Sequence, residues 1–189
     1  MFSKKVCELV MVIDRSGSMS SCKSAVIEGM NELIAKQRNI PGRCNLTTVL
    51  FDHEYLPQHT SADLQGIGYM DDTHYVPRGM TALWDAVGRT IENAKARFIK
   101  SKPDQVICVI VTDGIENASK EFTLEQVKKE IEKSDWEFVF IGANQDAVLT
   151  AKSIGIPSHH AMNYNATPLG TRQAYDGTSS IVGNLRSNK

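Results

Sequence analysis

Short apolar runs alternate along the chain with longer stretches in which apolar residues recur every three or four positions. The runs cover residues 6–13, 44–51, 105–112 and 136–143. They are rich in Val, Ile and Phe and contain few polar residues, which is typical of β-strands covered on both faces. We therefore expect a buried sheet, with the intervening stretches forming the layers that cover it.

The intervening stretches have the period of amphipathic helices. In residues 82–100, Leu83, Val87 and Ile91 fall on one face, while charged residues occupy the other. The same spacing predicts helices over residues 20–38 and 147–154 and after Thr123. Strands and helices that alternate in this way predict an α/β sandwich around a mainly parallel sheet.

Weaker signals complete the pattern. Residues 53–79 are polar with little periodicity, and we expect an edge strand and an irregular loop there. Thr123 and Gln126 have the spacing of a capping box, which marks the start of a helix. A last short strand is expected around residues 161–162, and a terminal helix from Pro168, although the pattern after about residue 158 is less regular. No repeat, low-complexity tract or linker occurs, so we expect one domain over residues 1–189.

Charge and composition exclude several classes of partner. The hydrophobic fraction is 41% and the charged fraction 23%, as in ordinary globular proteins. The net charge of -1 gives no electrostatic reason to expect nucleic acid or an anionic membrane as the main partner. No apolar run approaches the ~20 residues of a membrane-spanning helix. We therefore expect neither a nucleic-acid partner nor a membrane partner.

The N-terminus and the cysteines predict a cytoplasmic protein. Residues 1–14 place two lysines before an apolar stretch, as a signal peptide does, but Glu8 interrupts that stretch and no small-residue cleavage site follows. We interpret it as the first strand. The cysteines show no C-x-x-C spacing and are expected to be reduced, buried thiols. They are Cys7, Cys22, Cys44 and Cys108.

Two of the expected strands end in the same way, in an aspartate. "VMVID" ends at Asp14 and "VIVTD" ends at Asp113. The carboxyl ends of parallel strands lie along one edge of a sheet, where ligands bind, so the two carboxylates can meet. Asp14 is followed by Ser16 and Ser18, and Thr81 lies at the start of a helix that begins at the same edge.

All of these side chains offer oxygen. An oxygen donor set suits a hard divalent cation, Mg²⁺ or Mn²⁺, whereas zinc favours His and Cys. Two carboxylates balance the charge of one such ion. Taken singly, each residue has an ordinary alternative: Ser16, Ser18 or Thr81 could cap a helix, and Asp113 with its following glycine could form a turn. The combination favours a metal site.

The segments "DRSGSMS", "RGMTALWDA" and "VTDGIEN" resemble the three parts of the metal-ion-dependent adhesion site of von Willebrand factor A domains. The resemblance is greatest to the small, free-standing bacterial or phage members. It implies a Rossmann-like three-layer α/β/α sandwich, with one antiparallel edge strand in a mostly parallel sheet. It also implies that Ser16 and Ser18 bind the metal directly, and Thr81 directly or through water. Asp14 and Asp113 would act largely through water.

Other polar residues near these segments have less defined roles. Arg15 and Met19 flank the ligand residues, where a rim that meets a partner is one interpretation. For Arg15 a solvated loop is the favoured one. Asp52 and the following histidine come after a strand, but an exposed loop is the favoured interpretation. His159 and His160 are expected on a strand, where adjacent side chains point to opposite faces and cannot share a metal.

Three functions are consistent with the sequence. The first is a protein-binding module whose Mg²⁺ or Mn²⁺ receives an Asp or Glu carboxylate from a partner. The second is a metal-dependent phosphohydrolase with Asp14 as nucleophile, although Ser16 stands where a second carboxylate would be expected and no G-x-S-x-G or phosphate-binding loop occurs. The third is a regulatory or assembly subunit of a larger machine. The sequence determines neither the partner nor the oligomeric state.

Overall fold

A computed structural model of the chain describes residues 5–143 and 147–187. The N-terminal stretch was expected to form the first strand, and its residues 1–4 lie outside the described residues. A six-stranded sheet of order β3-β2-β1-β4-β5-β6 forms the centre. Its strands are β1 (Val6–Asp14), β2 (Arg43–Phe51), β3 (Tyr55–Asp63), β4 (Gln105–Thr112), β5 (Glu137–Ala143) and β6 (Ala161–Tyr164). Only β3, at one edge, is antiparallel to its neighbour. This confirms the expected fold class.

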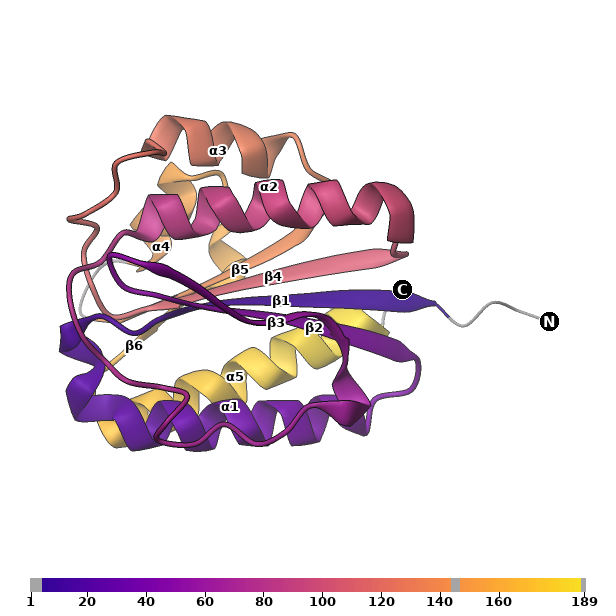
Figure 1. The fold of residues 1–189 in the computed structure, drawn as a ribbon, viewed down its shortest axis with the longest axis horizontal. Helices are drawn as coiled ribbons and strands as arrows, with labels where there is room; N and C mark the ends of the chain where they lie inside the picture. The colour runs from indigo at the N-terminus through magenta and orange to yellow at the C-terminus, as the bar shows by residue number, and fades with distance from the viewer. Residues whose placement is uncertain (1–4, 144–146, 188–189) are drawn as a thin grey trace.

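Helices cover both faces of the sheet (Figure 1). Helices α1 and α5 lie on one face, and α2, α3 and α4 on the other. They are α1 (Lys23–Arg38), α2 (Leu83–Ser101), α3 (Leu124–Glu132), α4 (Ala147–Ser153) and α5 (Pro168–Ser187). Among the described residues, no helix combines the length and the apolar character needed to cross a membrane.

The central strands are apolar throughout because they contact both helical layers. In β1, Leu9 and Met11 pack into the core beneath α1 and α5, while Val10 and Val12 pack into the core beneath α2 and α3. Strand β4 is buried along its whole length for the same reason. A strand with two covered faces cannot alternate apolar and polar residues, which explains why the sequence shows continuous runs.

The structure confirms most expected elements and corrects two details. The capping box of Thr123 and Gln126 is present at the start of α3. The first helical stretch begins with a 3₁₀ helix, η1 (Gly17–Cys22), before α1. His159 and His160 lie in another short 3₁₀ helix, η3 (Ser158–His160), and not on a strand, so the expected alternation of faces does not apply to them.

Candidate metal centre

The carboxyl ends of β1 and β4 lie side by side at one edge of the sheet. Ile13 pairs with Val111, so Asp14 at the end of β1 and Asp113 just after β4 follow neighbouring strands. Burial raises the pKa of Asp14, and the negative charge of Asp113 adds a smaller increase. The topology thus brings together two carboxylates that are far apart in sequence.

Ser16 and Ser18 are connected to Asp113 by hydrogen bonds. The hydroxyl oxygens of the two serines are 3.0 Å apart. The Ser18 hydroxyl donates to Asp113 Oδ1 at 2.6 Å. Ser16 and Asp113 are buried, whereas Ser18 is exposed. The loop after β1 and the loop after β4 therefore present their oxygens to one shared point that opens to solvent.

Asp14 is fully buried and both of its carboxylate oxygens accept hydrogen bonds. The Ser16 amide donates to Oδ1 at 2.6 Å, and the Thr112 hydroxyl donates to Oδ2 at 2.6 Å. Burial nevertheless raises the pKa of Asp14 to about 6, because the hydrogen bonds offset only part of the lost hydration. Burial also raises the pKa of Asp113, against the hydrogen bond from Ser18.

Thr81 lies against the loop that follows β4. Gly114 in that loop lies next to the Thr81 side chain. A Cβ atom added at Gly114 would be 2.6 Å from Thr81 Oγ1 and 3.4 Å from Asp14 Oδ2. The Thr81 hydroxyl and the Asp14 carboxylate thus both approach Gly114, at a distance that leaves no room for a side chain. Asn117 fixes Thr81 by accepting from its amide at 2.9 Å and donating to its carbonyl at 3.0 Å.

The hydroxyls of Ser16, Ser18 and Thr81 do not cap helices, which was the alternative role expected for them. Ala82, not Thr81, is the N-cap residue of α2, and it forms no side-chain cap hydrogen bond. Ser16 occupies the N-cap position of η1, but its side chain does not cap that helix either. Ser18 donates to Asp113 instead. The Ser20 hydroxyl, in contrast, bonds locally to the Gly17 carbonyl at 2.7 Å. Ser20 is therefore separate from the oxygen cluster.

Asp52 corrects an expectation: it is fully buried and not part of an exposed loop. Its Oδ2 lies 3.1 Å from Arg15 Nη2 and 3.1 Å from Arg78 Nε. Its carbonyl accepts from Ala82 at 2.9 Å. Asp52 thus connects the first metal-site loop to the segment that carries Thr81.

Arg15 is buried as well, so neither a solvated loop nor a free rim position describes it. Its amide donates to the Phe51 carbonyl at 2.7 Å, and its carbonyl accepts from Arg78 at 2.8 Å. The sequence did contain a signal for Asp52. It directly follows the apolar run of β2, in the same way that Asp14 ends β1 and Asp113 follows β4. Its partner Arg15 could not be inferred from that pattern.

Tyr75 is a further residue that the sequence did not single out. It is fully buried in the irregular stretch before α2, and its hydroxyl donates to the Asp14 carbonyl at 2.6 Å. Glu116 acts in the loop after β4, where it accepts from the Trp84 amide at 3.0 Å and so holds that loop on the start of α2. These residues position the ligand loops.

The oxygen cluster fits a hard divalent cation. Within the described ranges, no Lys or Arg forms an ion pair with Asp14 or Asp113, in contrast to Asp52. The same residues include no group of three or more His, Cys, Asp or Glu side chains suited to a metal. Two carboxylates beside hydroxyl oxygens, with no basic partner, are the donor set and charge that Mg²⁺ or Mn²⁺ requires.

Comparison with solved structures identifies the fold. The chain superposes on proximal thread matrix protein 1 from the mussel byssus, in a structure with a zinc-occupied MIDAS motif, with a TM-score of 0.69 and 14% identity. The match covers 95% of this chain and 46% of that one. The chain has the fold of a von Willebrand factor A domain. No protein-family model and no curated protein sequence matches it.

Two further structures show the same fold in different settings. The manganese-loaded TRAP protein of Plasmodium vivax matches with a TM-score of 0.63 and 19% identity, over 95% of this chain and 72% of that one. The pilus adhesin SpaC from Lactobacillus rhamnosus GG matches with a TM-score of 0.70 and 13% identity, over 97% of this chain and 30% of that one. The von Willebrand factor A fold of this chain thus spans less than half of the byssus protein and of SpaC.

Proposed function

We propose that this von Willebrand factor A fold is a divalent-metal-dependent protein-binding module. In the proposal, Ser16, Ser18 and Thr81 supply hydroxyl oxygens, and Asp14 and Asp113 supply the charge that holds Mg²⁺ or Mn²⁺. The bound ion would supply a Lewis-acidic position for an Asp or Glu carboxylate of a partner. The observation that carries the proposal is the pair of carboxylates, which no basic residue of the described ranges pairs with and which lie beside the serine hydroxyls.

The surroundings of the cluster support contact with a protein. Met80 directly precedes Thr81 and is 56% exposed. Ile115 lies two residues after Asp113 and is 72% exposed. Large apolar side chains next to a charged centre suit a partner that presents an acidic residue with apolar neighbours. Metal-loaded relatives of the same fold agree with a divalent ion in general. The choice of Mg²⁺ or Mn²⁺ is our proposal from the oxygen donors.

The geometry argues against the phosphohydrolase alternative. A nucleophilic carboxylate must contact its substrate directly. Asp14 is fully buried, and the Ser16 amide and the Thr112 hydroxyl each donate to one of its oxygens, so its carboxylate does not reach the surface. A role as a regulatory or assembly subunit is one form of the binding function, and the captured partner would identify it. A cytoplasmic location stays a prediction from the sequence.

The test is capture of acidic peptides with the metal site intact and disabled. Peptides that contain Asp or Glu between apolar residues are arrayed beside versions with Asn or Gln, and binding of the protein is measured in Mg²⁺ and in EDTA. We expect binding that requires both the acidic residue and the metal. The double variant Ser16→Ala/Ser18→Ala should lose it.

Ser20→Ala is the matched control. It removes a hydroxyl from the same loop, but one that bonds only to the Gly17 carbonyl. Binding by this variant should equal that of the wild type. Peptide binding that persists in EDTA, or that survives Ser16→Ala/Ser18→Ala, would contradict the proposed function.

A further inference from the structure

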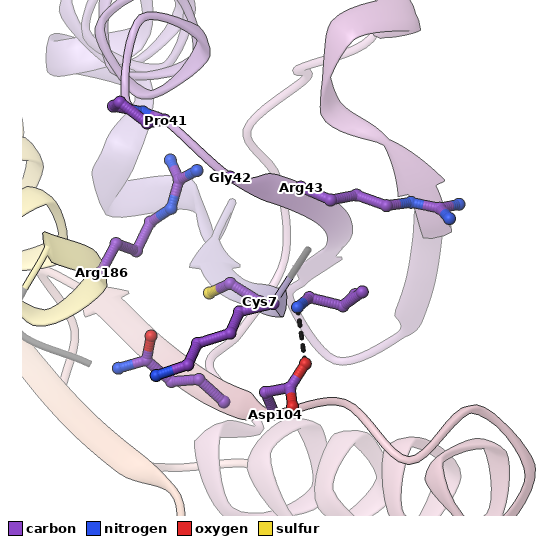
Figure 2. A pocket seen from close by; sticks show the side chains of 9 residues that line it. Cys7, Pro41, Gly42, Arg43, Asp104 and Arg186 are labelled. Carbon is purple, nitrogen blue, oxygen red and sulfur yellow. Dashed lines mark hydrogen bonds between the residues drawn. The ribbon is translucent and has the colours of Figure 1, made fainter. Parts of the chain in front are cut away.

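A cavity of about 320 Å³ lies at the end of the sheet opposite the oxygen cluster. It opens at the starts of β1, β2 and β4, and Figure 2 shows residues of all three strands around it, together with Arg186 of α5. Cys7 of β1 lines the cavity. None of the residues proposed to bind metal lies there, so any chemistry of this cavity is separate from the proposed function.

Cys7 and Cys44 face each other across β1 and β2. The two residues are directly paired in the parallel register, and both side chains belong to the core beneath α1 and α5. Neighbouring strands are about 4.8 Å apart, and disulfides join Cα atoms separated by about 4.4 to 6.8 Å. The register therefore places the two Cα atoms at a separation that a disulfide can join.

The two thiols already interact in the reduced protein. The proximity of the other thiol raises the pKa of Cys7 and lowers that of Cys44, so Cys44 is the sulfur favoured as a thiolate. In the reduced protein the Cys44 thiol donates to the Asn45 carbonyl at 3.6 Å. The positive charge of Arg186 favours the thiolate form of both. Gln37 fixes Arg186 by accepting from Nη1 through its carbonyl at 2.7 Å and its side chain at 3.0 Å.

Cys22 and Cys108 lack these features. Both are buried away from the cavity, Cys22 at the end of η1 and Cys108 in the middle of β4. Burial raises the pKa of the Cys108 thiol to about 12, so almost no thiolate forms at neutral pH. The chain thus contains one pair of neighbouring thiols, of which Cys7 lines the cavity, and two thiols elsewhere that serve as internal controls.

We propose that Cys7 and Cys44 are a redox modification site that small-molecule disulfides convert to an intramolecular disulfide. A protein thiolate attacks one sulfur of the small disulfide, forms a mixed disulfide and releases the first small thiolate. The second protein thiolate then attacks the protein sulfur of that mixed disulfide and releases the second small thiolate. The two protons of Cys7 and Cys44 end on the two released thiols, and the small disulfide is the oxidant.

Oxidation would tie the start of β1 to the start of β2. The segment between the two cysteines contains α1 and the loop with Ser16 and Ser18. A covalent closure of that segment restricts the unfolded chain, so the oxidised protein is expected to melt at a higher temperature. The increase should not require Mg²⁺, which distinguishes it from an effect of the oxygen cluster.

The experiment exposes the native protein to oxidised glutathione at several ratios to reduced glutathione. Thiols are then alkylated, and intact mass and peptide mapping report which cysteines have reacted. We expect loss of two thiols, a peptide link between Cys7 and Cys44, and full reversal by dithiothreitol. Cys22 and Cys108 should remain free for alkylation.

Variants make the assignment specific. Cys7→Ser and Cys44→Ser should each abolish the bridge, while Cys22→Ala/Cys108→Ala should form it as the wild type does. The wild type unfolded in urea, where all thiols react, is the positive control for oxidation. A native protein that keeps both thiols, stops at the mixed disulfide, or bridges through Cys22 or Cys108 would overturn the inference. Circular dichroism confirms that each variant used is folded.

Discussion

The Ser18 hydroxyl donates a 2.6 Å hydrogen bond to Asp113, although 95 residues separate them in the sequence. Ser18 belongs to the loop after β1 and Asp113 to the loop after β4, and these two strands are neighbours in the sheet. The bond gives the proposed metal centre its connection between two distant segments. It also identifies a side chain whose exposure allows a clean mutational test.

Ser18→Ala should weaken Mg²⁺ and Mn²⁺ binding by about tenfold or more, since it removes a proposed ligand and frees Asp113 to reorient. Stability without metal should change by less than about 1 kcal/mol, because the hydroxyl is exposed. Isothermal titration calorimetry measures the affinity and urea unfolding the stability. Ser20→Ala should leave both unchanged. Equal metal affinity in Ser18→Ala and the wild type would exclude Ser18 as a ligand.

Metal stabilisation should depend on pH through Asp14. Because burial raises its pKa from 3.8 to about 6, the favourable contribution of protonated Asp14 is complete below pH 3.8 and is lost as the pH rises through 6. That difference corresponds to roughly 3 kcal/mol in the metal-free protein. Bound Mg²⁺ would offset the cost of burying the negative charge only where Asp14 is ionised.

Thermal melting from pH 5 to 8, with and without saturating Mg²⁺, checks this expectation. The increase in Tm caused by Mg²⁺ should be large at pH 7.5 and should nearly disappear at pH 5. Asp14→Asn, which has no carboxylate at this position, should show no increase at any pH. An increase of the same size at pH 5 and pH 7.5 would show that Asp14 does not control metal binding.

Gly114→Ala should lower metal affinity by about tenfold or more, because the displaced groups are proposed metal ligands. The new Cβ would meet Thr81 Oγ1 at 2.6 Å, so the threonine or the loop must move. Gly68→Ala is the matched control, since no atom lies within 4 Å of a Cβ there. Titration with Mn²⁺ compares the two variants. Undiminished affinity in Gly114→Ala would mean that the Thr81 hydroxyl is not needed at its present position.

Asp52→Ala should destabilise the protein by about 3 kcal/mol, because it leaves the buried guanidinium of Arg15 with only the more distant, exposed carboxylate of Glu54 at 3.7 Å. Urea unfolding provides the measurement. Asp72→Ala, which removes an exposed ion pair with Lys23, should cost less than about 1 kcal/mol. A loss for Asp52→Ala as small as that for Asp72→Ala would show that the buried pair contributes little to stability.

Much of the fold followed from the sequence because its signals are local. Continuous apolar runs identified β1, β2, β4 and β5. The spacing of apolar residues every three or four positions identified the helices that cover the sheet. The edge strand β3 was expected only together with an irregular loop, since its half-buried and exposed residues do not alternate regularly. Helix α5 continues through Gly177, where Met162 occupies the space of a side chain. That packing has no counterpart in the local pattern.

The sequence by itself determined the fold class and the proposed ligands Asp14, Ser16, Ser18, Thr81 and Asp113. Each ligand was recognised from its own short segment, such as the end of an apolar strand or the spacing of two serines. Whether these residues bind metal stays a prediction. Only the tertiary structure decided that Asp52 is buried against Arg15 and that Cys7 faces Cys44. Both relationships depend on which strands are adjacent and in what register. Register is set by packing of whole layers, so no local pattern of residues contains it.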